Sequence, residues 1–306
     1  MPDPYDHKAF LAALSPARKT QLLTQSHLRG PLHLVGHLAV VAVFGAWVHM
    51  GWPLWWGAML PLGVALVFLF TLQHECTHKT PFAWGWLNEF MGHACGVVLV
   101  LPFTSFRYFH MAHHRWTNIA GKDPELAAPR PQTTGEILLY LSGVSYWQAR
   151  AKALWAEAFG GDLPDYIPRP AHGKVRAEAR LLLALYALLL GVTLALTPVL
   201  LWLWVLPVII AQPALRLYLL AEHGDCPQVT NMFENTRTTF TTALVRFLAW
   251  NMPYHAEHHI FPQVPYHNLP ALHGDVRQHL KVTENGYAAF TKNYLGRGDK
   301  GDGASN

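Results

Sequence analysis

The chain has 306 residues, and its composition departs from that of a water-soluble globular protein. Charged residues make up 14% of it, where about 25% is usual, and hydrophobic residues make up 51%. This composition excludes a disordered chain and argues against an ordinary soluble domain, because too few charges are present to cover the surface. The net charge of +4 is not gathered into a basic run or stripe, so we expect no nucleic acid partner.

Four long apolar runs predict an all-α integral membrane protein. Each has about twenty residues, enough to cross a hydrocarbon core of about 30 Å at about 1.5 Å per residue. Backbone groups in lipid must pair within their own segment, so each run is expected to be a transmembrane helix. The expected spans are residues 31–50, 54–72, 181–197 and 199–220.

The positions of the basic residues orient these spans. No Lys or Arg occurs between Gly30 and Gln73, or between Leu181 and Leu215. Because cytoplasmic segments carry the excess of Lys and Arg, the N-terminal arm, the central stretch and the segment after the last span are all expected on the cytoplasmic side. The spans then form two membrane hairpins, and Trp residues flank both hairpin turns, as is typical of a membrane interface.

This topology predicts three parts of the chain. Residues 1–30 form a cytosolic N-terminal arm, residues 31–295 form the membrane domain, and the Gly- and Asp-rich residues 296–306 form a disordered tail. Within the membrane domain, residues 73–180 and 221–295 are expected to build a cytosolic helical cap. The protein is therefore predicted to be multi-pass, in the inner membrane if the source is a bacterium.

Two further segments are expected to lie at the membrane without crossing it. The apolar run at residues 93–106 is too short for a full span and is predicted to be re-entrant or interfacial. Residues 136–159 alternate apolar and polar positions at helical spacing and hold Trp147 and Trp155, so a helix lying flat on the membrane surface is predicted there.

Three histidine clusters stand out in the predicted cap. They are His74-Glu-Cys-Thr-His78, His110-Met-Ala-His113-His114 and His255-Ala-Glu-His258-His259. Positions three and four residues apart share one face of a helix, so each cluster presents its imidazoles on one side. Neutral imidazole is a common metal ligand, and this spacing therefore indicates metal binding.

The number of histidines indicates more than one ion. The clusters supply eight histidines, and one first-row ion accepts at most about six ligands. A closed structural zinc site takes four ligands and would leave half of the histidines unused. Among the metals that imidazole suits, iron and copper carry out oxygen chemistry. We therefore interpret the clusters as a nitrogen-rich pair of irons at the membrane surface.

These clusters resemble the three histidine boxes of the membrane fatty acid desaturase superfamily, which also contains related hydroxylases and carotenoid oxygenases. The wider sequence is similar too, in HHRWTNIAGKDPEL, AEHGDC, NTRTT and NMPYHAEHHIFPQVPYHNLPALH. The resemblance extends from Leu72 to Leu272. The short first box is more similar to that of acyl-lipid desaturases than to that of acyl-CoA desaturases.

The resemblance implies four transmembrane helices beneath a cytosolic cap that holds two Fe²⁺ ions. It also implies a ninth ligand at the cytoplasmic end of the fourth span, where His223 lies. The implied metal ligands are His74, His78, His110, His113, His114, His223, His255, His258 and His259.

Polar residues near the boxes are candidates for supporting roles. Acidic side chains that could orient a ligand, or simply be solvated, are Glu257, Asp123, Glu222 and Asp225. On its helix Glu257 is expected to point away from the irons, toward a ligand of another box. Arginines that could contact a lipid headgroup or an electron donor, or simply lie on the surface, are Arg107, Arg115 and Arg237.

The implied activity is an O2-dependent acyl-lipid desaturase, which removes hydrogens from adjacent carbons of a lipid acyl chain to give a double bond and water. The chain has no flavin or nicotinamide fingerprint and no CxxC motif, so a ferredoxin or cytochrome b5-type partner is expected to supply the electrons. One alternative is a lipid or carotenoid hydroxylase or ketolase of the same superfamily. A more distant alternative is a membrane metal transporter, although transport ligands are expected near the bilayer midplane.

Overall fold

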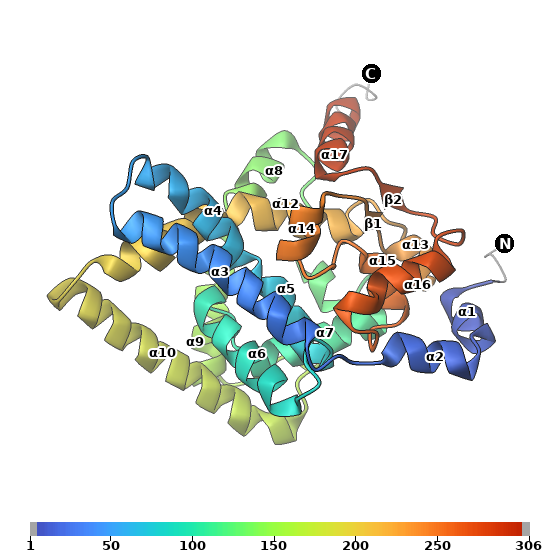
Figure 1. Ribbon diagram of the computed structural model, residues 1–306, viewed down its shortest axis with the longest axis horizontal. Coiled ribbons are helices and arrows are strands. Elements are labelled where there is room, and N and C mark those ends of the chain that lie inside the picture. The colour runs from blue at the N-terminus through green and yellow to red at the C-terminus, as the bar shows by residue number, and fades with distance from the viewer. Residues whose placement is uncertain (1–4, 302–306) are drawn as a thin grey trace.

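The computed structural model describes residues 5–301, with the side chains of residues 5–296. In this part of the chain the regular structure is almost all helical, as predicted, and two short strands are present. β1 (Thr238–Thr239) and β2 (Thr283–Glu284) pair in parallel, with Thr238 opposite Thr283. Figure 1 shows the long helices gathered on the left, and the strands and most of the short helices on the right.

Three helices are long and apolar enough to cross a membrane by themselves. They are α3 (Arg29–His49), the continuous pair α4 (Trp55–Val67) and α5 (Leu69–His78), and α10 (His172–Ala195) with the 3-10 turn η2 (Arg169–Ala171) before it. All three contain or overlap the predicted spans, because the apolar runs that predict a span also form the longest helices.

Two bent helix pairs pass the same test of length and composition. α6 (Gly85–Leu99) and α7 (Phe103–Trp116) are bent by 100° relative to each other. The π-helical turn η3 (Leu201–Val205) with α11 (Leu206–Ile210) is bent by 41° relative to α12 (Gln212–His223). The described residues therefore contain three to five candidate spans. The sharper bend falls within the apolar run that we expected to be re-entrant or interfacial.

Two predicted boundaries differ from the structure. Helix α10 begins at His172 instead of residue 181, because its first turns carry charged side chains that a search for apolar runs leaves out. Residues 136–159 form two helices instead of one, α8 (Thr134–Leu141) and α9 (Val144–Phe159). The break lies at Gly143, whose φ of +74° is a conformation that glycine adopts at little cost.

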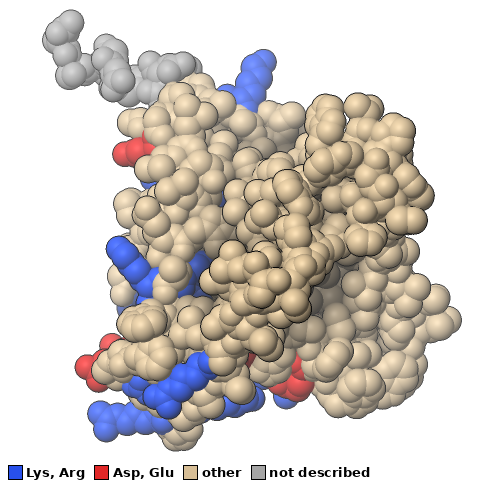
Figure 2. Space-filling view, turned by 90° about the vertical axis from the view of Figure 1, so that its left-hand side faces the viewer, with Lys and Arg blue, Asp and Glu red and all other residues tan. Residues whose placement is uncertain are grey.

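The apolar helices pack closely where small residues allow it. Gly63 of α4 lies against α11, and a Cβ on Gly63 would stand 2.0 Å from the Pro207 carbonyl oxygen. Only glycine permits this approach of the two backbones. Figure 2 looks onto the end of the molecule where α3 turns into α4, and most of that face carries no charged side chain. This agrees with the absence of Lys and Arg from the expected hairpins.

The remaining elements are short and precede, link or follow the long helices. They are α1 (His7–Ala13), α2 (Pro16–Leu23), η1 (Pro124–Ala127), α13 (Met232–Asn235), α14 (Ala243–Leu248), α15 (His255–Ile260), η4 (Tyr266–Asn268), α16 (Leu269–Val276) and α17 (Tyr287–Gly301). Helix α17 continues into the expected disordered tail at residues 296–306, of which 302–306 lie outside the described residues.

Candidate metal centre

Four helices deliver all nine histidines that the sequence singles out. α5 supplies His74 and His78, α7 supplies His110, His113 and His114, α12 ends on His223, and α15 supplies His255, His258 and His259. Helical spacing places the histidines of each box on one face, as expected. Residues separated by more than 180 positions in the chain thus face one another.

The nine imidazoles form two groups, each of which could hold a metal ion. Within a group, each histidine offers one ring nitrogen, and these nitrogens all lie within 4.8 Å of one another. The first group contains His74, His78, His110, His114 and His258. The second group contains His113, His223, His255 and His259. His113 and His114 are consecutive, so α7 contributes to both groups and the two lie side by side.

The spacing of the ring nitrogens fits shared metal coordination. In the first group, the Nε2 atom of His110 lies 2.8 Å from that of His78 and 2.9 Å from that of His114. In the second, the Nε2 atom of His255 lies 3.1 Å from those of His223 and His259. Nitrogens this close together can bind one ion jointly, because metal–nitrogen bonds are about 2.0–2.1 Å long.

The tautomers of the second group also call for a cation. His223 Nδ1 faces the Asn235 carbonyl oxygen at 3.2 Å and can only donate to it, which leaves the Nε2 lone pair free. Thr117 donates its hydroxyl hydrogen to the His113 carbonyl oxygen, so it accepts from His259 Nδ1 at 3.1 Å. His259 Nε2 therefore also carries a lone pair. His255 Nε2 faces the Nε2 lone pairs of both His223 and His259. A single proton on His255 Nε2 could bond to only one of them, whereas a metal ion could bind both.

Burial keeps the histidines of α15 in the form that binds metal. Burial first, and then the neighbouring imidazoles, hold the pKa of His255, His258 and His259 well below the usual value. These rings are therefore neutral near pH 7. In the first group, both ring nitrogens of His74 are buried without a hydrogen-bond partner, as expected of a ligand whose partner is an ion.

Two of the four predicted carboxylates lie directly against the histidines. Asp123 places both carboxylate oxygens 3.0 Å from His113 Nδ1. Glu222 lies 3.3 Å from His255 Nδ1. A carboxylate beside Nδ1 keeps the ring proton on Nδ1. The lone pair of Nε2 is then available to bind a metal, and Nε2 becomes more basic.

The other two predicted carboxylates have different positions. Glu257 does point away from the two groups, as expected, but its oxygens contact Thr238 Oγ1 at 2.6 Å and His273 Nδ1 at 2.5 Å. It thus ties α15 to β1 and α16 rather than orienting a box histidine. Asp225 lies just beyond the end of α12, in a turn where its φ is +58°.

Sequence analysis missed Glu75, although it lies inside the first histidine box. Its Oε1 atom is 3.5 Å from His258 Nδ1 and 3.9 Å from His74 Nδ1, and its other oxygen accepts from Thr80 Oγ1 at 2.8 Å. The carboxylate is completely buried. The signal that the sequence does carry is an acidic residue between two box histidines, because a carboxylate taken out of water needs a polar partner.

A second missed residue, Glu178 of α10, positions α7. Its carboxylate accepts hydrogen bonds from the backbone N–H groups of Phe103 at 2.8 Å and Thr104 at 2.9 Å, and it contacts His93 Nδ1 at 2.8 Å. It therefore satisfies orphan donors at the N-terminus of α7, where negative charge is favourable. Seventy-five residues separate it from Phe103, so no local pattern reveals the contact.

Two of the arginines proposed to contact a headgroup or donor have structural partners instead. Arg107 pairs with Glu89 at 2.7 Å and lies over the Phe103 ring. Arg237 is buried and donates to the carbonyl oxygens of Ala221 and Gly224. Arg115, the third, lies beside the ring of Trp116.

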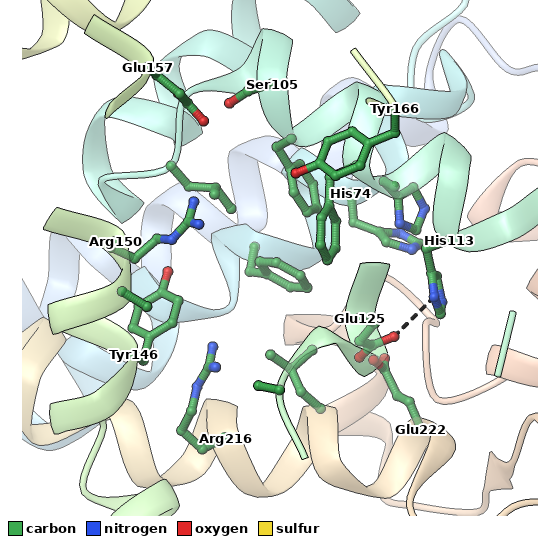
Figure 3. A pocket seen from close by; sticks show the side chains of 18 of the residues that line it. His74, Ser105, His113, Glu125, Tyr146, Arg150, Glu157, Tyr166, Arg216 and Glu222 are labelled. Atoms are coloured by element: carbon green, nitrogen blue, oxygen red, sulfur yellow. Dashed lines mark ion pairs between the residues drawn. The ribbon is translucent and has the colours of Figure 1, made fainter. Parts of the chain in front are cut away.

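A cavity of about 340 Å³ opens onto both histidine groups. Its lining includes His74 and His110 of the first group and His113 and His255 of the second. Aromatic and aliphatic side chains line much of the rest, namely Phe70, Leu101, Phe106, Phe109 and Leu219. Figure 3 shows His74 and His113 on one side of this cavity and Tyr146, Arg150 and Arg216 on the other. An apolar chain that enters the cavity would therefore reach the histidines.

Comparison with known proteins decides the family. Residues 50–291 match the family model described as fatty acid desaturase. The chain belongs to the fatty acid desaturase family. It is therefore an oxidoreductase of lipid metabolism. The alternative that the chain is a membrane metal transporter is accordingly set aside. The apolar helices and the family together indicate a membrane-associated protein.

Desaturases from several organisms are similar to this family member over most of its length. An sn-1 oleoyl-lipid 12-desaturase of Picosynechococcus sp. is 24% identical over 265 residues, which cover 79% of this chain and 75% of the relative. A protein of the same name from Arthrospira platensis is 23% identical, over 75% of this chain and 71% of the relative. A chloroplastic omega-3 fatty acid desaturase of Glycine max is 24% identical, over 87% of this chain and 60% of the relative.

Proposed function

We propose that this desaturase is an O2-dependent acyl-lipid desaturase that uses two iron ions held by its nine clustered histidines. The observation that carries the proposal is the pair of adjacent, largely buried histidine groups that line one cavity with apolar side chains. The names of the relatives support an acyl-lipid substrate, since two of them are oleoyl-lipid desaturases. The reaction would place a double bond in a lipid acyl chain.

The histidines would hold the metal, and the carboxylates would set their tautomers. His74, His78, His110, His114 and His258 would bind one ion, and His113, His223, His255 and His259 the other. A bound iron pair would supply the reduction of dioxygen that removes two hydrogens from an unactivated chain, which side-chain acids and bases alone cannot do. Asp123, Glu222 and Glu75 would keep the protons on Nδ1, so that Nε2 remains free for the metal.

The cavity wall would position the acyl chain and exclude water. Phe70, Phe106 and Phe109 contribute apolar surface beside the histidines, and a methylene chain gains free energy by contact with such surface. A chain held there in one conformation would present one pair of carbons to the metal. A dry site also protects the reaction from side reactions with water.

We further propose four membrane spans in two hairpins, with the histidine groups at the cytoplasmic face. The spans would be α3, α4 with α5, α10, and the bent segment from η3 to α12, while α6 and α7 would enter the membrane surface without crossing. The distribution of basic residues supports this orientation. It would place the metal pair within reach of a soluble or membrane-bound ferredoxin or cytochrome b5-type donor, which supplies two electrons per turnover.

The proposal is tested by producing the protein in a host of known lipid composition and analysing the lipids by mass spectrometry. We expect a new acyl species that has lost two hydrogens, and we expect it to disappear in His258→Ala. His49→Ala is the matched control, because His49 lies exposed at the end of α3, outside both histidine groups, and its product should persist. A species that has gained one oxygen would instead identify a hydroxylase of the same superfamily.

A further inference from the structure

The cavity has a second polar end, opposite the histidines. Arg150 of α9 and Arg216 of α12 both line it, and Tyr146 lies between them in Figure 3. Figure 3 shows the two guanidinium groups on the same side of the cavity, across from His74 and His113. Both arginines are half-buried, and neither was singled out by the sequence.

Neither guanidinium group has a carboxylate partner. Among the described residues, arginine forms ion pairs only between Arg18 and Asp275 and between Arg107 and Glu89. The Nε atom of Arg216 is buried without a hydrogen-bond partner, and its guanidinium lies 4.1 Å from the centre of the Tyr146 ring. Withdrawing a cation from water without an anion is unfavourable, so this end of the cavity is built to receive a negative charge.

The carboxylates of the cavity do not supply that charge. Glu125 is 3.1 Å from His113, and Glu125 and Glu222 both lie on the histidine side in Figure 3. Glu157 lies nearer to Arg150, but the two side chains form no ion pair, and burial raises the pKa of Glu157. One oxygen of Glu157 is itself buried without a hydrogen-bond partner.

The order of surfaces along the cavity matches an amphipathic molecule. The arginines lie on one side of the cavity and His74 and His113 on the other, and Phe70, Phe106 and Phe109 also line it (Figure 3). Arg216 precedes His223 by seven residues in the same helix, which places their backbones about 10 Å apart along its axis. A headgroup at the arginines would therefore leave part of an acyl chain to extend toward the histidines.

A second, smaller cavity favours a ligand with two chains. It has a volume of about 170 Å³ and is lined only by apolar or aromatic residues, namely Val98, Val100, Trp147, Trp204, Val205, Val208 and Ile209. The Tyr146 ring, which lines the larger cavity, packs against the Trp147 ring, which lines the smaller one, with ring centroids 5.1 Å apart, so one pair of rings contributes to both cavities. Nearby, Trp155 and Phe159 of α9 are 63% and 56% exposed, as expected of a helix that rests on lipid.

We propose that Arg150 and Arg216 bind the phosphate of a diacyl phospholipid, with one acyl chain in the larger cavity and the other in the smaller one. The planar guanidinium group presents paired N–H donors that match phosphate oxygens. The substrate class is then a phosphate-bearing membrane lipid instead of a neutral glycolipid. This inference rests on the proposed function, because it names the substrate of the same site.

The test is equilibrium binding of lipid to the purified, iron-loaded full chain, without an electron donor so that no turnover occurs. The probes are dioleoyl phosphatidylglycerol, a monogalactosyl lipid with the same chains, and free oleate. We expect the phospholipid to bind at least about tenfold more tightly than the other two. Arg150→Gln and Arg216→Gln should each weaken phospholipid binding by about tenfold and leave galactolipid binding unchanged. Arg277→Gln, at an exposed arginine outside the cavity, is the control.

Several results would overturn the inference. Equal affinity of the wild type for the phospholipid and the galactolipid would be one such result. This comparison uses only the wild-type protein, so it does not depend on whether the variants fold. If free oleate bound as tightly as the phospholipid, the arginines would bind the carboxylate of a free fatty acid instead of a phosphate. Unchanged phospholipid binding in both glutamine variants would also exclude the site. If the protein prefers the phospholipid but forms no double-bond product, the arginine site is supported and the proposed desaturase function is refuted. If the protein forms the product equally from both lipids, the desaturase function is supported and the arginine site is refuted.

Discussion

Replacing Glu178 with glutamine should loosen α7 and thereby weaken both histidine groups. In the wild type, one carboxylate oxygen accepts from the Phe103 N–H and His93 Nδ1, and the other accepts from the Thr104 N–H. Glutamine keeps one acceptor oxygen and turns an amide NH2 toward the remaining donor. It also removes a negative charge from the N-terminus of a helix that carries three of the nine histidines.

The cost of Glu178→Gln follows from these contacts. An unsatisfied buried donor costs about 1–3 kcal/mol. Loss of the charge at the helix N-terminus adds about 0.3–1 kcal/mol. We therefore expect the free energy of unfolding to fall by about 1.3–4 kcal/mol, enough to lower Tm by several degrees and to speed the loss of metal.

Two measurements check this prediction. Thermal unfolding in detergent gives the change in Tm, and amide hydrogen exchange reports whether the Phe103 and Thr104 N–H groups have lost protection. Asp162→Asn is the control, since Asp162 is an exposed carboxylate that precedes α10. If Glu178→Gln unfolds at the wild-type temperature, retains its metal and keeps both amides protected, then Glu178 does not hold α7 in place.

Three other changes have defined expected outcomes, two of them with a size and one with a direction. Asp123→Asn should weaken metal binding by about 10–100-fold, as seen by competition with a chelator, because His113 loses its charged partner. Gly63→Ala should lower the free energy of unfolding by about 1–3 kcal/mol, since its Cβ would meet the Pro207 carbonyl oxygen; an unchanged Tm would contradict the close approach of α4 and α11. The metal-free chain should lose stability as the pH falls below about 6.5, because the α15 histidines bind protons there when unfolded but resist them when folded. The free energy of unfolding of the metal-free chain, measured at pH 7.5 and 5.5, checks this; equal or greater stability at pH 5.5 would contradict the prediction.

Local spacing was enough to predict the histidines but not what holds them. Each box repeats at three or four residues, so its face on a helix follows from the sequence alone. The long apolar runs likewise predicted the helices that could span a membrane. By contrast, Glu178 reaches α7 across 75 residues of chain, and only the packing of α10 beside the break between α6 and α7 brings them together.

Helix ends and supporting side chains were harder to predict for the same reason. Gly143 divides the expected surface helix with its positive φ, and a side chain there would meet Gln212, which comes from another helix. The carboxylate of Glu257 has the orientation expected from helical geometry, yet its partner His273 comes from α16. Arg150 and Arg216 carry no motif, and their significance lies in the cavity that they share.

The central claim is that the nine histidines hold two irons in each chain. Elemental analysis of purified, active protein tests it most directly. We predict two iron atoms per chain in the wild type and about one in a variant that replaces both His255 and His259 with alanine, which leaves the five-histidine group intact. A wild-type value of one iron or fewer in active protein, or a stoichiometric content of zinc in its place, would contradict the account.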